Sequence, residues 1–90
     1  MPKKRKDVES ALVSKGFVQN DTHHHMFVYY TRAGKKTTLR TRTSHGMREI
    51  GDNLLGQMAK QCGLRKKDFL DLVDCPLNRA GYEEKVKDRL

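Results

Sequence analysis

Three consecutive histidines, His23, His24 and His25, are the residues of this chain whose types best suit chemistry. They open an apolar and aromatic run over residues 26–30, which predicts a β-strand. Successive strand side chains point to opposite faces, so we expect His24 on one face and its two neighbours on the other. Because imidazole has an unperturbed pKa of about 6.5, such a histidine is a ready proton-transfer group near neutral pH.

The charge of the chain suggests what a histidine would act on. Nineteen Lys and Arg residues against eleven Asp and Glu give a net charge of +8 on 90 residues. Such a balance favours polyanions, and nucleic acid is the commonest polyanion for a small domain, although an acidic protein partner fits equally well. No stretch is long and apolar enough for a membrane span or a signal sequence. Cys62 and Cys75 lack C-x-x-C spacing, so we expect free thiols and a cytoplasmic protein.

A ribonuclease that works without a metal needs a base for the 2′-hydroxyl and cations for the charge on the phosphorane. His24 suits the first role, and Arg40, Arg42 or a neighbouring lysine suits the second. The alternative is that His24 is an ordinary strand residue and that the arginines, with Lys35 and Lys36, form a solvated surface.

A metal site is the other use of clustered histidines. His23 and His25 stand at i, i+2 on one strand face, a spacing that two metal ligands can use. The sequence spaces no third and fourth ligand to complete a site, since Cys62 and Cys75 stand on separate predicted elements. We therefore expect no metal and no other cofactor.

Hydrophobic periodicity and turn residues divide the chain into a small number of elements. They predict a helix over 6–15, strands over 17–19, 24–32 and 36–43, a helix over 54–62, and helices over 66–73 and 79–90. Ala33-Gly34 marks a hairpin turn, and Asp52 is expected to be an N-cap. One helical layer on one face of a three-stranded antiparallel sheet is the economical packing, and it leaves the other face to solvent or a ligand.

The whole chain, residues 1–90, is expected to form one domain. Residues 1–6 contain Pro2-Lys3-Lys4-Arg5-Lys6, which has the form of a nuclear-import signal but is more commonly a solvated basic tail. Residues 76–90 are expected to be a C-terminal extension.

Several short motifs occur in an order that resembles the HicA family of mRNA interferase toxins. The resemblance runs from Asp7 to about Leu72. Its motifs are Lys15-Gly16-Phe17, Thr22-His23-His24, the hairpin 30–37, Thr43-Ser44-His45-Gly46, Glu49-Ile50, the helix 54–63 and the ending 64–69. Asp21-Thr22 stand where the family has Gly-Ser, and Ser44 precedes His45 where the family has proline.

The resemblance implies an α+β fold like that of a double-stranded-RNA-binding domain, α-β-β-β-α, here with extra C-terminal helices. It implies a metal-independent endoribonuclease of a type II toxin–antitoxin system, acting on mRNA and held in check by an acidic HicB-like antitoxin. His24 takes the place of the catalytic histidine. The expected nucleic-acid contacts are His23, Lys35, Lys36, Arg40, Arg42 and His45. A non-catalytic RNA-binding module and a protein that only docks an antitoxin are the alternatives.

Overall fold

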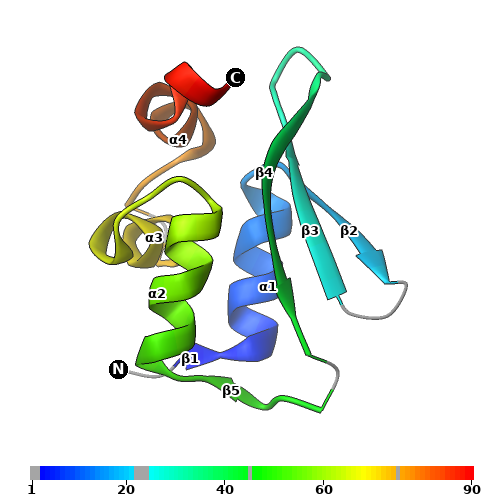
Figure 1. The fold of residues 1–90 in the computed structure, drawn as a ribbon, viewed down its shortest axis with the longest axis vertical. Coiled ribbons are helices and arrows are strands. Elements are labelled where there is room, and N and C mark those ends of the chain that lie inside the picture. The colour runs from blue at the N-terminus through cyan, green and yellow to red at the C-terminus, as the bar shows by residue number, and fades with distance from the viewer. Residues whose placement is uncertain (1–2, 22–24, 45, 75) are drawn as a thin grey trace.

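The computed structural model describes residues 3–21, 25–44, 46–74 and 76–90 (Figure 1). The elements are β1 (Lys3–Lys4), α1 (Arg5–Ser14), β2 (Phe17–Asp21), β3 (His25–Tyr30), β4 (Lys36–Thr43), β5 (Glu49–Ile50), α2 (Asp52–Gln61), α3 (Lys66–Val73), α4 (Arg79–Lys85) and a final 3-10 turn (Lys87–Arg89). The predicted order of one helix, three strands and three further helices is confirmed. The sequence pattern does not predict β1 and β5, which have two residues each.

The three long strands form an antiparallel sheet in the order β2-β3-β4. Their side chains alternate as the period of two predicts: along β4, Leu39, Thr41 and Thr43 are buried while the residues between them are exposed. The register shifts between Val28 and Tyr30. There the Thr37 hydroxyl donates to the Tyr29 carbonyl at 2.8 Å, which satisfies a backbone acceptor beside the irregularity.

The helices of the described residues all lie on one side of this sheet (Figure 1). Each helix contributes one apolar stripe at the spacing of a helical turn, and these stripes meet the inward side chains of the sheet. The buried stripe residues are Val8 and Leu12 of α1, Leu55, Met58 and Ala59 of α2, and Phe69, Leu72 and Val73 of α3. The structure is thus a small α+β domain with a single helical layer. The opposite sheet face carries no described helix, as the sequence predicts.

The expected solvated tail is wrong for residues 3–6. Lys3 and Lys4 pair with Ile50 and Glu49 as β1 and β5, and α1 begins directly at Arg5. The Lys3 ammonium also lies 2.7 Å from a carboxylate oxygen of Asp74. Backbone pairing with a distant segment therefore holds a stretch whose composition alone resembles a free basic tail.

The start of α2 differs by one residue from the prediction. Gly51 is the N-cap, and Asp52 is the first residue of the helix. The reason is that the Gly51 carbonyl already accepts the first helical hydrogen bond, from the Leu55 amide at 2.9 Å.

The C-terminal segment 76–90 packs into the same core as the rest of the domain. Tyr82 of α4 is fully buried, and its hydroxyl donates to the Cys62 carbonyl at 2.8 Å. Its ring centroid lies 5.5 Å from that of Phe17 and 4.8 Å from that of Tyr29. Val86, just after α4, is 2 % exposed. This aromatic cluster joins the C-terminal segment to β2 and β3.

Candidate nucleic-acid interface

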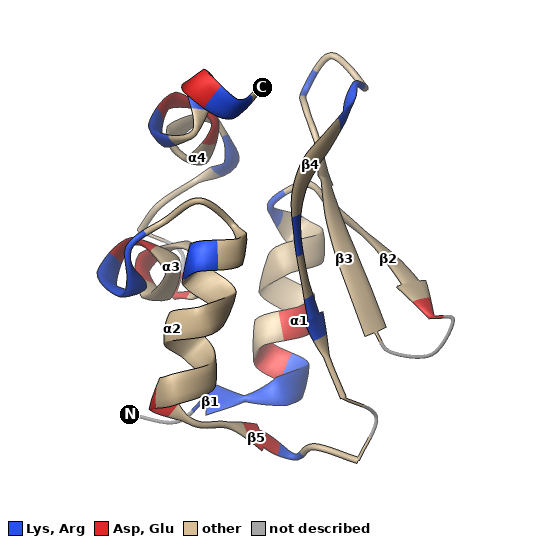
Figure 2. Ribbon diagram, in the orientation of Figure 1, with Lys and Arg blue, Asp and Glu red and all other residues tan. Residues whose placement is uncertain are grey.

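The uncovered side of the three-stranded sheet, here called the open sheet face, combines cations with apolar side chains. Strand alternation places the exposed Lys36, Arg40 and Arg42 of β4 on it. Its other residues are Thr38 of β4, Met26, Val28 and Tyr30 of β3, and Val18 and Asn20 of β2. Figure 2 shows the basic positions spaced along β4, one of the two edge strands of this sheet.

The register sets each cation of this face directly beside an apolar or aromatic neighbour. Arg42 pairs with Met26, Arg40 with Val28, and Lys36 with Tyr30. A hollow of about 410 Å³ lies over β4, lined in part by Val28, Lys36 and Arg40. Cations bind phosphates, and apolar or aromatic side chains contact bases, so the two rows suit the two components of a nucleic-acid strand.

The predicted site residues fall into three groups. Lys36, Arg40 and Arg42 lie together on the open sheet face. Lys35 is exposed in the turn between β3 and β4, where its backbone amide donates to the Thr31 hydroxyl at 3.0 Å. His23, His24 and His45 lie outside the described residues.

His25 forms a pair that the sequence patterns did not reveal. It lies on the helix-facing side of β3, the side opposite Met26, as alternation predicts. Its Nδ1 is 2.8 Å from Asp21 Oδ1 and 3.2 Å from Gln19 Nε2, and its side chain is 15 % exposed. A carboxylate at Nδ1 fixes the orientation of an imidazole. An acidic residue four positions before a histidine, across a predicted turn, is the only sequence signal for this pair.

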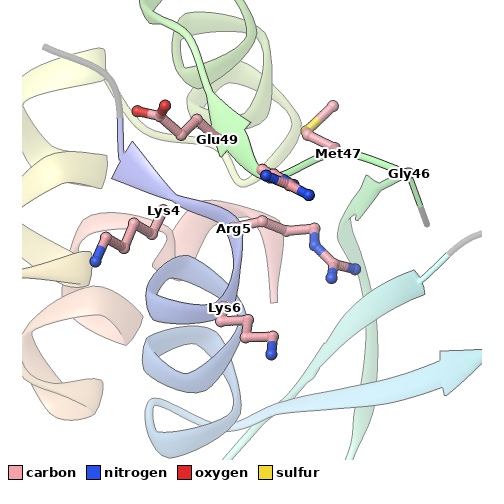
Figure 3. Close-up of a pocket in the computed structure, with 7 residues that line it drawn as sticks. Lys4, Arg5, Lys6, Gly46, Met47 and Glu49 are labelled. Carbon is pink, nitrogen blue, oxygen red and sulfur yellow. The ribbon is translucent and has the colours of Figure 1, made fainter.

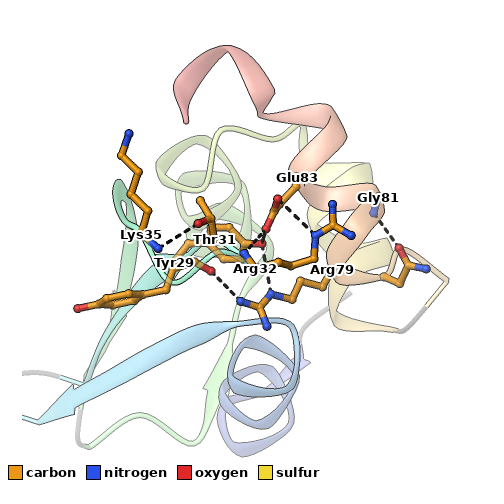
Figure 4. Close-up of polar contacts among 9 residues, drawn as sticks. Tyr29, Thr31, Arg32, Lys35, Arg79, Gly81 and Glu83 are labelled. Atoms are coloured by element: carbon orange, nitrogen blue, oxygen red, sulfur yellow. Dashed lines mark hydrogen bonds and ion pairs between the residues drawn. The ribbon is translucent and has the colours of Figure 1, made fainter.

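The opposite end of the sheet is fixed by a network around Glu83 of α4 (Figure 4). One carboxylate oxygen of Glu83 accepts hydrogen bonds from the Tyr29 hydroxyl at 2.6 Å and from the Arg32 amide at 2.8 Å. The guanidinium of Arg79 donates to the Tyr30 carbonyl at 2.9 Å. These bonds hold the β3–β4 hairpin, and with it the backbone of Tyr30, against the C-terminal segment.

The network also sets a pH dependence of stability. The pKa of Glu83 is lowered, mainly by the hydrogen bond that its carboxylate accepts from the Tyr29 hydroxyl. The pKa of Tyr29 is raised to about 12, mainly by burial of its hydroxyl. A carboxyl whose pKa falls on folding stabilises the fold above its unfolded pKa, about 4.3 for glutamate, and that stability is lost as pH falls through the folded pKa.

We therefore expect Glu83→Gln to flatten the acidic side of the pH–stability profile. The measurement is the urea midpoint between pH 3 and pH 7. Glu84→Gln is the matched control, because the Glu84 side chain is 74 % exposed and bonds only to Lys87 among the contacts described. Equal acid sensitivity in wild type and Glu83→Gln would show that the network does not respond to pH.

Among the described residues, no group of three or more His, Cys, Asp or Glu side chains is placed to hold a metal ion. No helix in the described part of the chain has the length and apolar character needed to cross a membrane.

Comparison with known proteins gives no relative. No protein-family model matches the chain, and no curated protein or solved structure gives a significant match. The resemblance to HicA toxins therefore stays a prediction, and the residues of this chain carry the functional argument.

Proposed function

We propose that this protein binds RNA across the open sheet face and cleaves it as a HicA-like, metal-independent endoribonuclease of a type II toxin–antitoxin system. The observation that supports it best is the row of cations on β4, set in register beside the apolar row on β3. An acidic HicB-like antitoxin is the proposed partner, because a face with three cations would attract acidic side chains as well as phosphates.

The geometry of β4 suits a strand of RNA. Alternate residues on a strand are about 6.6 Å apart, so Arg40 and Arg42 are spaced to contact successive phosphates of one RNA strand. The neighbouring Tyr30 and Val28 offer surfaces on which unpaired bases can rest. Single-stranded RNA is therefore the proposed substrate, since its bases are free to reach the β3 row.

The proposed reaction needs one base and charge stabilisation. His24 accepts the proton of a 2′-hydroxyl, whose oxygen then attacks the adjacent phosphorus. The bond from phosphorus to the 5′-oxygen breaks, and this oxygen takes a proton from water while His24 releases its own proton to solvent. The products are a 2′,3′-cyclic phosphate on one fragment and a 5′-hydroxyl on the other. Arg40 and Arg42 stabilise the negative charge that develops on the phosphorane oxygens.

The test of binding is the salt dependence of RNA affinity. Three to four phosphate contacts predict a log–log slope of about −2 to −3, because each contributes about −0.7 on single strands. Arg40→Gln/Arg42→Gln should make the slope shallower by about 1.4, the share of two contacts. The readout is fluorescence anisotropy of a labelled oligoribonucleotide between about 50 mM and 300 mM salt, because the logarithm of the affinity should fall linearly with the logarithm of the salt concentration.

Lys60→Gln/Lys67→Gln is the matched control for this experiment. It removes the same charge from exposed positions on α2 and α3, on the helical side of the sheet (Figure 2). The control should retain the wild-type slope. If both double variants lose affinity equally, net charge alone explains binding and the open sheet face has no special role.

A further inference from the structure

A second basic hollow lies at the end of the domain where β1 and β5 pair (Figure 3). Its volume is about 620 Å³. Its charged lining residues are Lys4, Arg5, Lys6, Arg48 and Glu49. The lining thus has four cations and one carboxylate, and these residues come from two segments more than forty residues apart in the sequence. This excess of positive charge in a concave site is the kind of environment that binds an anion.

Arg5 is the residue whose surroundings argue most directly for a ligand. Its side chain is 16 % exposed, and its Nε is buried with no hydrogen-bond partner among the described residues. Its Nη1 is 3.7 Å from Glu9, and Glu9 also accepts a hydrogen bond from the Thr43 hydroxyl. Buried donors are nearly always satisfied, by protein or by ordered water. The unmet Nε and the long 3.7 Å ion pair leave this guanidinium weakly held, so a turn of the side chain brings it to a ligand oxygen in the hollow.

The same region carries further positive potential. Lys4, the N-cap of α1, makes no side-chain capping bond, and the positive end of the ten-residue helix begins at Arg5. In Figure 3 the side chains of Arg5 and Lys6 extend to the same side of the hollow, while Lys4 and Glu49 extend to the other. A single anionic group seated near Arg5 and Lys6 is the arrangement these side chains favour.

A smaller hollow lies beside this site, between the end of β4 and helix α2. It has a volume of about 170 Å³, and its lining includes Arg42 at the end of β4 and Met47. Met47 also lines the larger hollow. Arg42 and Arg48, six residues apart in the chain, therefore line two neighbouring hollows that share Met47. A nucleic-acid strand that leaves the open sheet face at Arg42 meets the larger hollow next.

We infer that the hollow lined by Arg5, Lys6 and Arg48 binds a phosphate group of the same RNA strand that crosses the open sheet face. The inference rests on the proposed function for the identity of the strand. The inference that the hollow binds an anion depends only on Arg5 and the neighbouring cations.

The first experiment uses inorganic phosphate as the probe on the full chain. NMR should show the Nε–Hε resonance of Arg5 moving as phosphate is added, relative to a chloride titration at equal ionic strength. Lys6→Gln/Arg48→Gln should remove most of this shift. Both residues are exposed, so this variant should fold as the wild type does. An Arg5 resonance that ignores phosphate would overturn the inference.

The second experiment measures the RNA affinity of the same variant. Loss of one phosphate contact should make the log–log salt slope shallower by about 0.7. The gain in affinity on lowering the salt from 1 M to 0.1 M should then be roughly fivefold smaller in the variant than in the wild type. Lys60→Gln/Lys67→Gln should bind as the wild type does. Unchanged RNA affinity in Lys6→Gln/Arg48→Gln would also overturn the inference, whatever the phosphate titration shows.

The two proposals fail separately. If Arg40→Gln/Arg42→Gln binds RNA normally while Lys6→Gln/Arg48→Gln binds it weakly, RNA does not bind to the open sheet face. Binding at the hollow lined by Arg5, Lys6 and Arg48 is then supported. If the first variant loses affinity and the second does not, the open sheet face stands and the hollow does not hold RNA.

Discussion

His24→Ala should abolish nearly all RNA cleavage and leave RNA binding within about twofold of the wild-type value. General-base assistance contributes about 10²–10⁴ to a rate, so loss of the imidazole should slow cutting by that factor. Binding should persist because the proposed phosphate contacts are the exposed Lys36, Arg40 and Arg42, which this variant keeps. Single-turnover cleavage of a labelled RNA is the measurement. The wild-type rate should survive EDTA, and it should rise with pH because only a neutral imidazole can accept the proton.

His23→Ala is the control for this variant, because strand alternation predicts that neighbouring histidines face opposite sides of the sheet. With protein in excess over RNA it should cut far faster than His24→Ala, because the expected contact of His23 with RNA adds affinity and not proton transfer. Full activity in His24→Ala would refute the mechanism. His25, which Asp21 holds at 2.8 Å, would then be the next histidine to substitute. If wild type binds RNA and cuts none, the non-catalytic module is correct.

The elements that the sequence predicted best are those with a strong local period. Strand β4 runs over Lys36–Thr43 and helix α3 over Lys66–Val73, and both match their predicted bounds. In β4 the alternation of threonine with arginine defines two faces without reference to any other segment. That is why Arg40 and Arg42 could be placed on one surface from the sequence alone.

Features made by distant segments have no such signal. The two-residue strands β1 and β5 are too short to show a period, and they pair across more than forty residues. Lys15 is a similar case. Its ammonium is buried and donates to the carbonyls of Leu72 and Leu77 at 2.9 Å and 2.6 Å. Only the tertiary fold brings those carbonyls to the end of α1, so the sequence around Lys15 carries no signal for these two bonds.

The candidate site divides along the same line. The cations of the open sheet face come from one strand, and the sequence predicts them. The hollow proposed to bind phosphate is lined by Arg5 at the start of α1 and by Arg48 just before β5, so it forms only once β1 and β5 have paired. Basic residues near the N-terminus are commonly solvated, which hides a structured site of this kind.

Tyr82→Ala should destabilise the domain by about 3–5 kcal/mol, the usual cost of removing a fully buried aromatic side chain. Tyr82 contacts the rings of both Phe17 and Tyr29, so its loss opens a cavity between the C-terminal segment and the sheet. A domain of this size is stabilised by roughly 5–15 kcal/mol in total. We therefore expect a melting temperature lower by roughly 12 °C or more, from about 4 °C per kcal/mol. Urea unfolding followed by circular dichroism gives the free energy directly.

Two companion variants separate the ring from the hydroxyl and from the surface. Tyr82→Phe keeps the ring but removes the hydrogen bond to the Cys62 carbonyl, so it should cost only about 1–3 kcal/mol. Lys87→Ala, at an exposed position in the final turn, should change stability by less than about 0.5 kcal/mol. If Tyr82→Ala is no more harmful than Lys87→Ala, residues 76–90 are not part of the folded core in solution. The Glu83 network would then be unable to hold the β3–β4 hairpin, and Glu83→Gln should lose its effect as well.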